Sequence, residues 1–123
     1  MRRLVRKEWR ISCYEYELEI DTEFIDRLNR IIAEDYILES EEPVTLTETD
    51  VIKAWERYYE DENSTLNRKV LGIKYYDGTE HIYSYNVELG EVLADILNDM
   101  MWEQDYNEIE SNTDDVYDTV EEN

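Results

Sequence analysis

The chain has 123 residues, of which 33 are acidic and 12 are basic, so its formal net charge at neutral pH is −21. Leu, Ile, Val and Phe number 30, enough for the packed core of one domain. The negative charge repels nucleic acids and anionic membranes and argues against direct binding to either, and no apolar run is long enough for a membrane helix. A single cysteine excludes an internal disulfide, so nothing in the cysteines points outside the reducing cytoplasm.

The charges are unevenly distributed along the chain. Residues 1–10 hold five bases and one acid, whereas residues 75–123 hold fifteen acids and no lysine or arginine. Opposite charge at the two ends leaves both a monomer and a head-to-tail dimer open. Residues 111–123 have few apolar side chains and are predicted to form a mobile acidic tail outside a single domain of residues 1–110.

Residues 8–20 are predicted to form a strand, because apolar and acidic residues alternate there. One face is expected to be buried. The other face carries a row of carboxylates about 6.8 Å apart, formed by Glu15, Glu17 and Glu19.

Two helices are expected next. Apolar residues recur at three and four positions from Asp21, which predicts a helix capped by Asp21 and ending near Tyr36. A second helix is expected from Thr47 to about Asp61, because Thr47 and Asp50 have the spacing of a capping box. In both helices bases are interleaved with acids.

A hairpin is predicted from residues 69–76 and 79–87. A three-residue loop, Tyr76-Asp77-Gly78 with Gly78 in the left-handed conformation, collects the apolar side chains on one face. It pairs Leu71 with Tyr83, Ile73 with His81 and Lys74 with Glu80.

The final helix, about residues 88–107, has the strongest apolar pattern in the chain. The predicted order is therefore β-α-α-β-β-α. This order favours an α+β fold in which a small antiparallel sheet of about three strands is covered by about three helices.

Motifs for catalysis or for cofactor binding are absent. His81 is the only histidine and has no nucleophile near it in the sequence, and Cys13 lies among apolar neighbours. No glycine-rich phosphate loop and no calcium-loop spacing occurs. The protein is expected to be no enzyme and to need no cofactor or metal. An enzyme built on carboxylates from several elements remains a weaker alternative.

The outer face of the last helix carries four acids at successive i, i+4 positions: Glu91, Asp95, Asp99 and Glu103. Such a row is destabilised by repulsion between its members, and no base relieves it. Trp102 and Tyr106 are expected to emerge on the same side, where an exposed tryptophan is suited to anchor an interface. The alternatives are a merely solvated acidic face and a Trp102 folded back onto the domain.

This acidic region resembles the small DNA-mimic inhibitors of phages and mobile elements, which include anti-CRISPR and anti-restriction proteins. The likeness lies in size, charge and the acidic residues of the last third, which are Glu91, Asp95, Asp99, Glu103, Asp105, Glu108, Glu110, Asp114 and Asp115. It implies a non-enzymatic inhibitor whose carboxylates stand in for phosphates on the basic nucleic-acid-binding surface of a nuclease.

The resemblance therefore implies a partner that is a CRISPR effector or a restriction nuclease, and a location in the cytoplasm of a bacterial host cell. The predicted partner-binding residues are Glu15, Glu17, Glu19, Glu91, Asp95, Asp99, Trp102, Glu103, Asp105, Tyr106, Glu108 and Glu110. The alternative function is an acidic adaptor or immunity-type module, which binds a basic protein without competing with nucleic acid.

Overall fold

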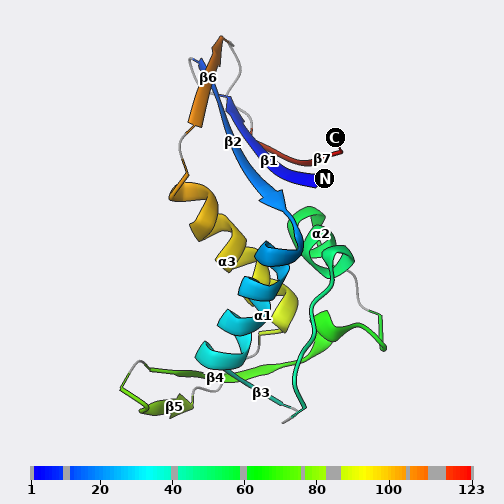
Figure 1. Cartoon of the computed structure of the whole chain (residues 1–123), viewed down its shortest axis with the longest axis vertical. Helices are drawn as coiled ribbons and strands as arrows, with labels where there is room; N and C mark the ends of the chain where they lie inside the picture. The colour runs from blue at the N-terminus through cyan, green and yellow to red at the C-terminus, as the bar shows by residue number, and fades with distance from the viewer. Residues whose placement is uncertain are drawn as a thin grey trace.

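The computed structural model describes residues 2–9, 12–39, 42–58, 61–75, 77–82, 87–104, 106–110 and 116–122. Within these residues the chain forms three α-helices, one short 3-10 helix and seven strands in two antiparallel sheets. This confirms the predicted α+β class. The strands are divided between two sheets, however, and Figure 1 shows one above the helices and the other below them.

The larger sheet contains β1 (Arg2–Trp9), β2 (Ser12–Ile20), β6 (Tyr106–Glu110) and β7 (Val116–Glu122). The strand order is β6-β2-β1-β7, and every neighbouring pair is antiparallel. The two ends of the chain lie side by side, as the N and C labels in Figure 1 show, because Arg2 is paired with Glu122.

The larger sheet corrects three predictions. The strand expected over residues 8–20 begins only at Ser12, as β2, and it is preceded by a strand that was not predicted, β1. The helix expected to reach residue 107 ends at Trp102, and β6 follows it. The second half of the expected tail, Val116–Glu122, is strand β7, whereas residues 111–115 lie outside the described residues.

Charge pairing explains why these strands form in spite of their polarity. Arg3 on β1 donates one hydrogen bond to Glu17 of β2 at 2.9 Å and another to Glu121 of β7 at 2.8 Å. Arg6 donates two hydrogen bonds to Asp118 of β7, at 2.8 and 3.1 Å. The basic strand is thus flanked by acidic ones, and the charges that would destabilise each strand alone are offset in the sheet.

The first two helices begin where their caps predict. α1 (Thr22–Asp35) is capped by the Asp21 side chain, which accepts a hydrogen bond from the Phe24 amide at 2.8 Å. α2 (Glu48–Glu56) has the complete capping box between Thr47 and Asp50. It ends earlier than the predicted Asp61, because the next residue, Arg57, leaves the helix with a φ of 144°.

The smaller sheet contains β3 (Tyr36–Leu38), β4 (Val70–Lys74) and β5 (Glu80–Ile82), in the order β3-β4-β5. The 3-10 helix η1 (Thr65–Asn67) precedes it. Ile73 pairs with His81 and Lys74 with Glu80, and Gly78 has a φ of 82°, so the predicted hairpin register and turn are confirmed. The predicted pairing of Leu71 with Tyr83 lies outside the described residues.

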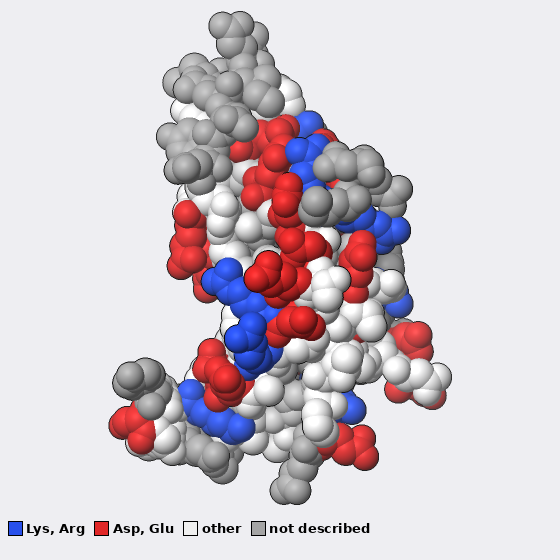
Figure 2. Space-filling view, viewed as in Figure 1, with Lys and Arg blue, Asp and Glu red and all other residues white. Residues whose placement is uncertain are grey.

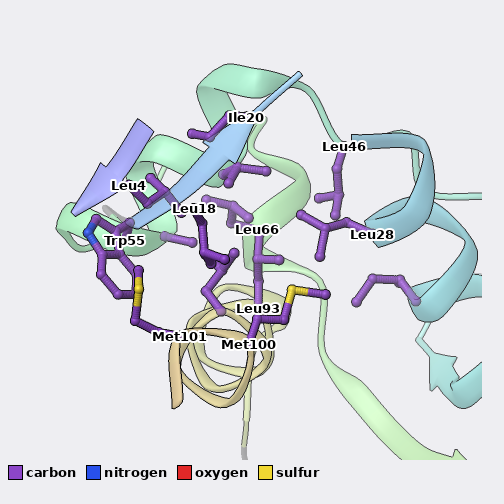
Figure 3. Packing of buried hydrophobic residues seen from close by; sticks show 14 of the residues in the cluster. Leu4, Leu18, Ile20, Leu28, Leu46, Trp55, Leu66, Leu93, Met100 and Met101 are labelled. Atoms are coloured by element: carbon purple, nitrogen blue, oxygen red, sulfur yellow. The ribbon is translucent and has the colours of Figure 1, made fainter. Parts of the chain in front are cut away.

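A single hydrophobic core joins the larger sheet to the helices. Leu4 of β1 and Leu18 and Ile20 of β2 belong to this core, together with residues of α3 (Leu89–Trp102) that include Leu93 and Met101. Figure 3 shows these side chains meeting Leu28, Leu46, Trp55 and Leu66 from the other elements. Each fully buried leucine stabilises the fold by roughly 2 kcal/mol. The core therefore holds α3 with one face inward and leaves its other face outward.

Candidate partner-binding surface

The outward face of α3 carries the predicted row of acids. The side chains of Glu91, Asp95, Asp99 and Glu103 are all exposed, while Leu89, Leu93 and Leu97 are fully buried on the opposite side. One helical turn, about 6 Å of rise, separates neighbouring members, so the row extends over about 18 Å. We call these four residues the α3 acidic face.

None of the four carboxylates of the α3 acidic face forms an ion pair with another described residue. The helix itself contains no lysine or arginine. Its negative charge is therefore not neutralised by any ion pair in the described part of the molecule, although Arg57 lines a groove with Glu91 and Asp95, and Arg27 lines another with Glu103.

The acidic row on β2 has a different environment. Glu17 is bound by Arg3, and Glu15 lies 3.5 Å from the Lys7 ammonium, so β1 neutralises two of the three predicted residues. Glu19 is exposed. Figure 2 shows acidic and basic atoms mingled over the face that carries β2 and α1. The sequence alone did not show this, because the bases come from a strand that it did not predict.

The ends of the two acidic rows meet at a groove between β2, α1 and α3. Glu19 and Glu103 both line this groove, together with Arg27 of α1. Three of the remaining predicted residues, Tyr106, Glu108 and Glu110, belong to β6, and Asp105 lies outside the described residues. Tyr106 is thus not one turn further along the helix as expected, but is paired with Tyr16 across the sheet.

Trp102 ends α3 and is 55% exposed. Its indole ring contacts the Tyr16 ring, with the centroids 6.0 Å apart and the planes tilted by 56°. The contact orients the indole without covering it. The side chain is therefore held at the end of the α3 acidic face with much of its apolar surface available.

Tyr58 is a functional candidate that the sequence reasoning missed. Its ring lies over Gly90, where an added Cβ would be 2.5 Å from the ring carbons, and its hydroxyl lies near the carboxylates of Glu88 and Glu91. Burial, and then the negative charges of Glu91 and Glu88, raise the pKa of Tyr58 to about 12. The phenol remains a hydrogen-bond donor at neutral pH. The signal in the sequence is the glycine at the start of an otherwise regular helix.

A second groove lies between α2 and α3 beside Tyr58. It is lined by Ala54, Arg57, Tyr58, Val87, Glu91, Ala94 and Asp95. Apolar groups form most of the lining, and two members of the α3 acidic face stand at it. We call it the α2–α3 groove.

β1 is fixed against α3 and α2 through one arginine. Arg6 is hydrogen-bonded to Asn98 of α3 as well as to Asp118, and its guanidinium lies 5.0 Å from the centre of the Trp55 ring. Its side chain is only 14% exposed. The basic strand is therefore engaged inside the fold, and Arg6 contacts α3 at Asn98 without forming an ion pair with the α3 acidic face.

The two residues considered for catalysis, Cys13 and His81, belong to strands of different sheets. Cys13 is a fully buried free thiol, and burial raises its pKa, which disfavours the reactive thiolate. His81 pairs with Ile73 through the β5 backbone. The described residues hold no group of three histidine, cysteine or acidic side chains suited to a metal ion. No helix among them has the length and apolarity needed to cross a membrane.

Comparison with known proteins gives no likeness: the chain matches no protein-family model, no curated protein and no solved structure.

Proposed function

We propose that the protein is a non-enzymatic inhibitor that binds the basic nucleic-acid-binding surface of a nuclease through the α3 acidic face. The favoured target is an RNA-guided effector nuclease, whose binding of target DNA would be blocked. A restriction nuclease is the second target class. Trp102, at the end of the row, serves as the apolar anchor of the interface.

One observation carries this proposal, namely the contrast between paired and unpaired acids. Four acids of β2 and β7, namely Glu15, Glu17, Asp118 and Glu121, are bound by Arg3, Arg6 and Lys7 of β1. The four carboxylates of α3 are exposed and have no ion-pair partner among the described residues. Selection for folding alone favours placing a base in such a row, so a row without bases points to a partner that supplies them.

The spacing of the carboxylates supports a partner whose surface normally binds phosphates. Carboxylates about 6 Å apart along a helix match the scale of neighbouring phosphates on one nucleic-acid strand. A partner that reads DNA presents lysine and arginine at such intervals, and opposite charge accelerates its encounter with the inhibitor.

The test is a cleavage assay with purified RNA-guided nucleases and restriction enzymes, each incubated with the protein before duplex DNA is added. The wild-type chain is expected to inhibit at stoichiometric amounts, and excess non-cleavable duplex is expected to relieve the inhibition. Reversing two charges in the variant Asp95→Lys/Asp99→Lys should weaken inhibition by about a hundredfold or more, because the attraction becomes repulsion.

The matched control reverses two exposed acids of α1, in the variant Glu23→Lys/Asp26→Lys. It changes the net charge by the same amount and should leave inhibition nearly intact. Equal losses in both variants would mean that only net charge acts and would refute the role of α3. A partner that is bound but indifferent to DNA would support the acidic adaptor instead.

A further inference from the structure

The α2–α3 groove is open because small residues face each other where the two helices meet. Ala54 of α2 is 4% exposed and Ala94 of α3 is half-buried. Larger side chains at these positions would close the space between the helices. Val87 and the ring of Tyr58 complete an apolar lining.

The Tyr58 wall of the groove is held in place from two sides. Its ring packs on Gly90, where no side chain intervenes, and its hydroxyl lies near the carboxylates of Glu88 and Glu91. A flat aromatic surface is thus fixed beside a carboxylate.

Charge at the groove selects what can occupy it. Glu91 and Asp95 line it, and neither forms an ion pair with a described residue. An anion would be repelled, and a purely apolar group would leave two carboxylates without their water. A long apolar stem with a cationic head satisfies both the lining and the carboxylates.

We propose that the α2–α3 groove receives one arginine side chain of the protein partner, with its stem on Ala54 and Ala94 and its guanidinium between Tyr58 and Asp95. Arginine fits better than lysine, because its planar head stacks on an aromatic ring and binds a carboxylate through two parallel hydrogen bonds. This inference rests on the proposed function, since it names the partner group that meets one end of the α3 acidic face.

Arg57 also lines the groove, and its positive charge repels a cationic ligand. It is exposed and makes no ion pair with Glu91, Asp95 or any other described residue. Its charge therefore lowers the affinity for arginine without occupying the carboxylates. Removing that charge, in Arg57→Gln, should strengthen binding about threefold.

The experiment is an NMR titration of the ¹⁵N-labelled full chain at low salt with a capped Gly-Arg-Gly peptide. The same peptide with citrulline in place of arginine is the control, because citrulline keeps the shape and loses the charge. Arginine is expected to shift the amide signals of Ala54, Tyr58 and Ala94, and citrulline to bind about tenfold more weakly.

Two variants test the groove itself. Ala94→Leu fills it without changing any charge and should weaken arginine binding about tenfold, and Asp95→Asn should do so to a similar extent while preserving the shape. Unchanged binding by Ala94→Leu, equal binding of citrulline, or shifts confined to Asp99 and Glu103 would overturn the inference.

The same variants separate this inference from the proposed function. An Ala94→Leu protein that binds the peptide as the wild type does, yet still inhibits a nuclease, would refute the arginine site and leave the proposed function standing. A wild-type protein that binds the arginine peptide at Ala54 and Ala94 but inhibits no nuclease would support the site and refute the proposed function.

Discussion

Arg57 adopts a backbone conformation that almost only glycine tolerates. Its φ is 144° and its ψ is 137°, and it is the residue at which α2 ends. A side chain held in such a region costs about 1–3 kcal/mol. Strain of this kind is found next to binding sites, and Arg57 does line the α2–α3 groove. The chain thus retains arginine at position 57, although the folded protein would be more stable with glycine there.

Replacing Arg57 by glycine should therefore stabilise the protein. We expect the free energy of unfolding to rise by about 1 kcal/mol, because the strain at φ 144° disappears. Urea unfolding followed by circular dichroism measures this change. The control is Arg57→Ala, which removes the same guanidinium but keeps a Cβ. An equal gain in both variants would trace the effect to charge and not to the backbone.

The pH dependence of Tyr58 is a second prediction for a single residue. Its pKa is raised from 10.0 to about 12 in the folded protein, so the folded state favours the protonated phenol. The resulting stabilisation is fully present below pH 10 and is lost as the pH rises from 10 to 12.

Tyrosinate absorbance and urea unfolding across this pH range test the prediction, with Tyr58→Phe as the control. The wild type minus variant difference spectrum should show one phenol that titrates near pH 12. The stability advantage of the wild type over the variant should shrink above pH 10. A difference spectrum with an ordinary midpoint would contradict the burial of the Tyr58 phenol beside the negative charges of Glu91 and Glu88.

At the scale of elements, β1 connects parts of the chain that are distant in sequence. It is hydrogen-bonded to β2 on one side and to β7 on the other, and Arg2 reaches α2 through an ion pair with Glu48 at 3.3 Å. Val120 of β7 packs against the core. The larger sheet is therefore built around the basic strand β1, which lies between the acidic strands β2 and β7.

A double-mutant cycle at Arg6 and Asp118 should measure how strongly β7 is held. The pair shares two hydrogen bonds and the arginine side chain is 14% exposed, so we expect a coupling energy of about 1 kcal/mol, larger than for most surface pairs. The single variants are Arg6→Gln and Asp118→Asn, compared with the double variant in urea unfolding. Purely additive effects would mean that the pair does not hold the strand.

The sequence predicted elements that carry a local signal and missed those that depend on distant partners. Asp21, Thr47 and Gly78 sit at caps and a turn, where the preference of one residue decides the geometry. β1 has charged residues on both faces, so the alternation rule finds no apolar side. Its formation depends on ion pairs with acids that lie eight to 118 positions further along the chain.

The candidate surface, too, was predicted only in part from the sequence. The α3 acidic face follows from helical spacing alone, and the structure places all four members outward. The pairing of Glu15 and Glu17 with β1 could not be foreseen without that strand. The α2–α3 groove depends on how two helices pack, which brings Ala54 and Ala94 together from positions forty residues apart.

At the scale of the whole molecule, the net charge destabilises the compact fold, whereas the ion pairs between β1 and its neighbouring strands stabilise it. A charge of −21 repels itself in any compact state, and this repulsion is screened by salt. The ion pairs around β1 are partly buried and are screened less. Salt should therefore stabilise the fold while it weakens attraction to a basic partner.

We accordingly expect the midpoint of thermal unfolding to rise when salt increases from about 0.01 M to about 1 M, over which the Debye length falls from about 30 Å to about 3 Å. A melt followed by circular dichroism measures it. The variant Asp95→Asn/Asp99→Asn should start from a higher midpoint at low salt and gain less. A midpoint that falls with salt would show that the ion pairs of the sheet outweigh the repulsion.

The pairing of the first strand with the last sets the order in which the protein can be completed during synthesis. β7 begins 107 residues after β1 ends, so at about 5–20 residues per second the ribosome needs roughly 5–20 s to deliver it. Until then one edge of β1 stays open, and Arg3 and Arg6 lack Glu121 and Asp118. A nascent chain that stalls before Val116 therefore presents a basic, unpaired strand edge, the opposite of the acidic surface of the finished protein.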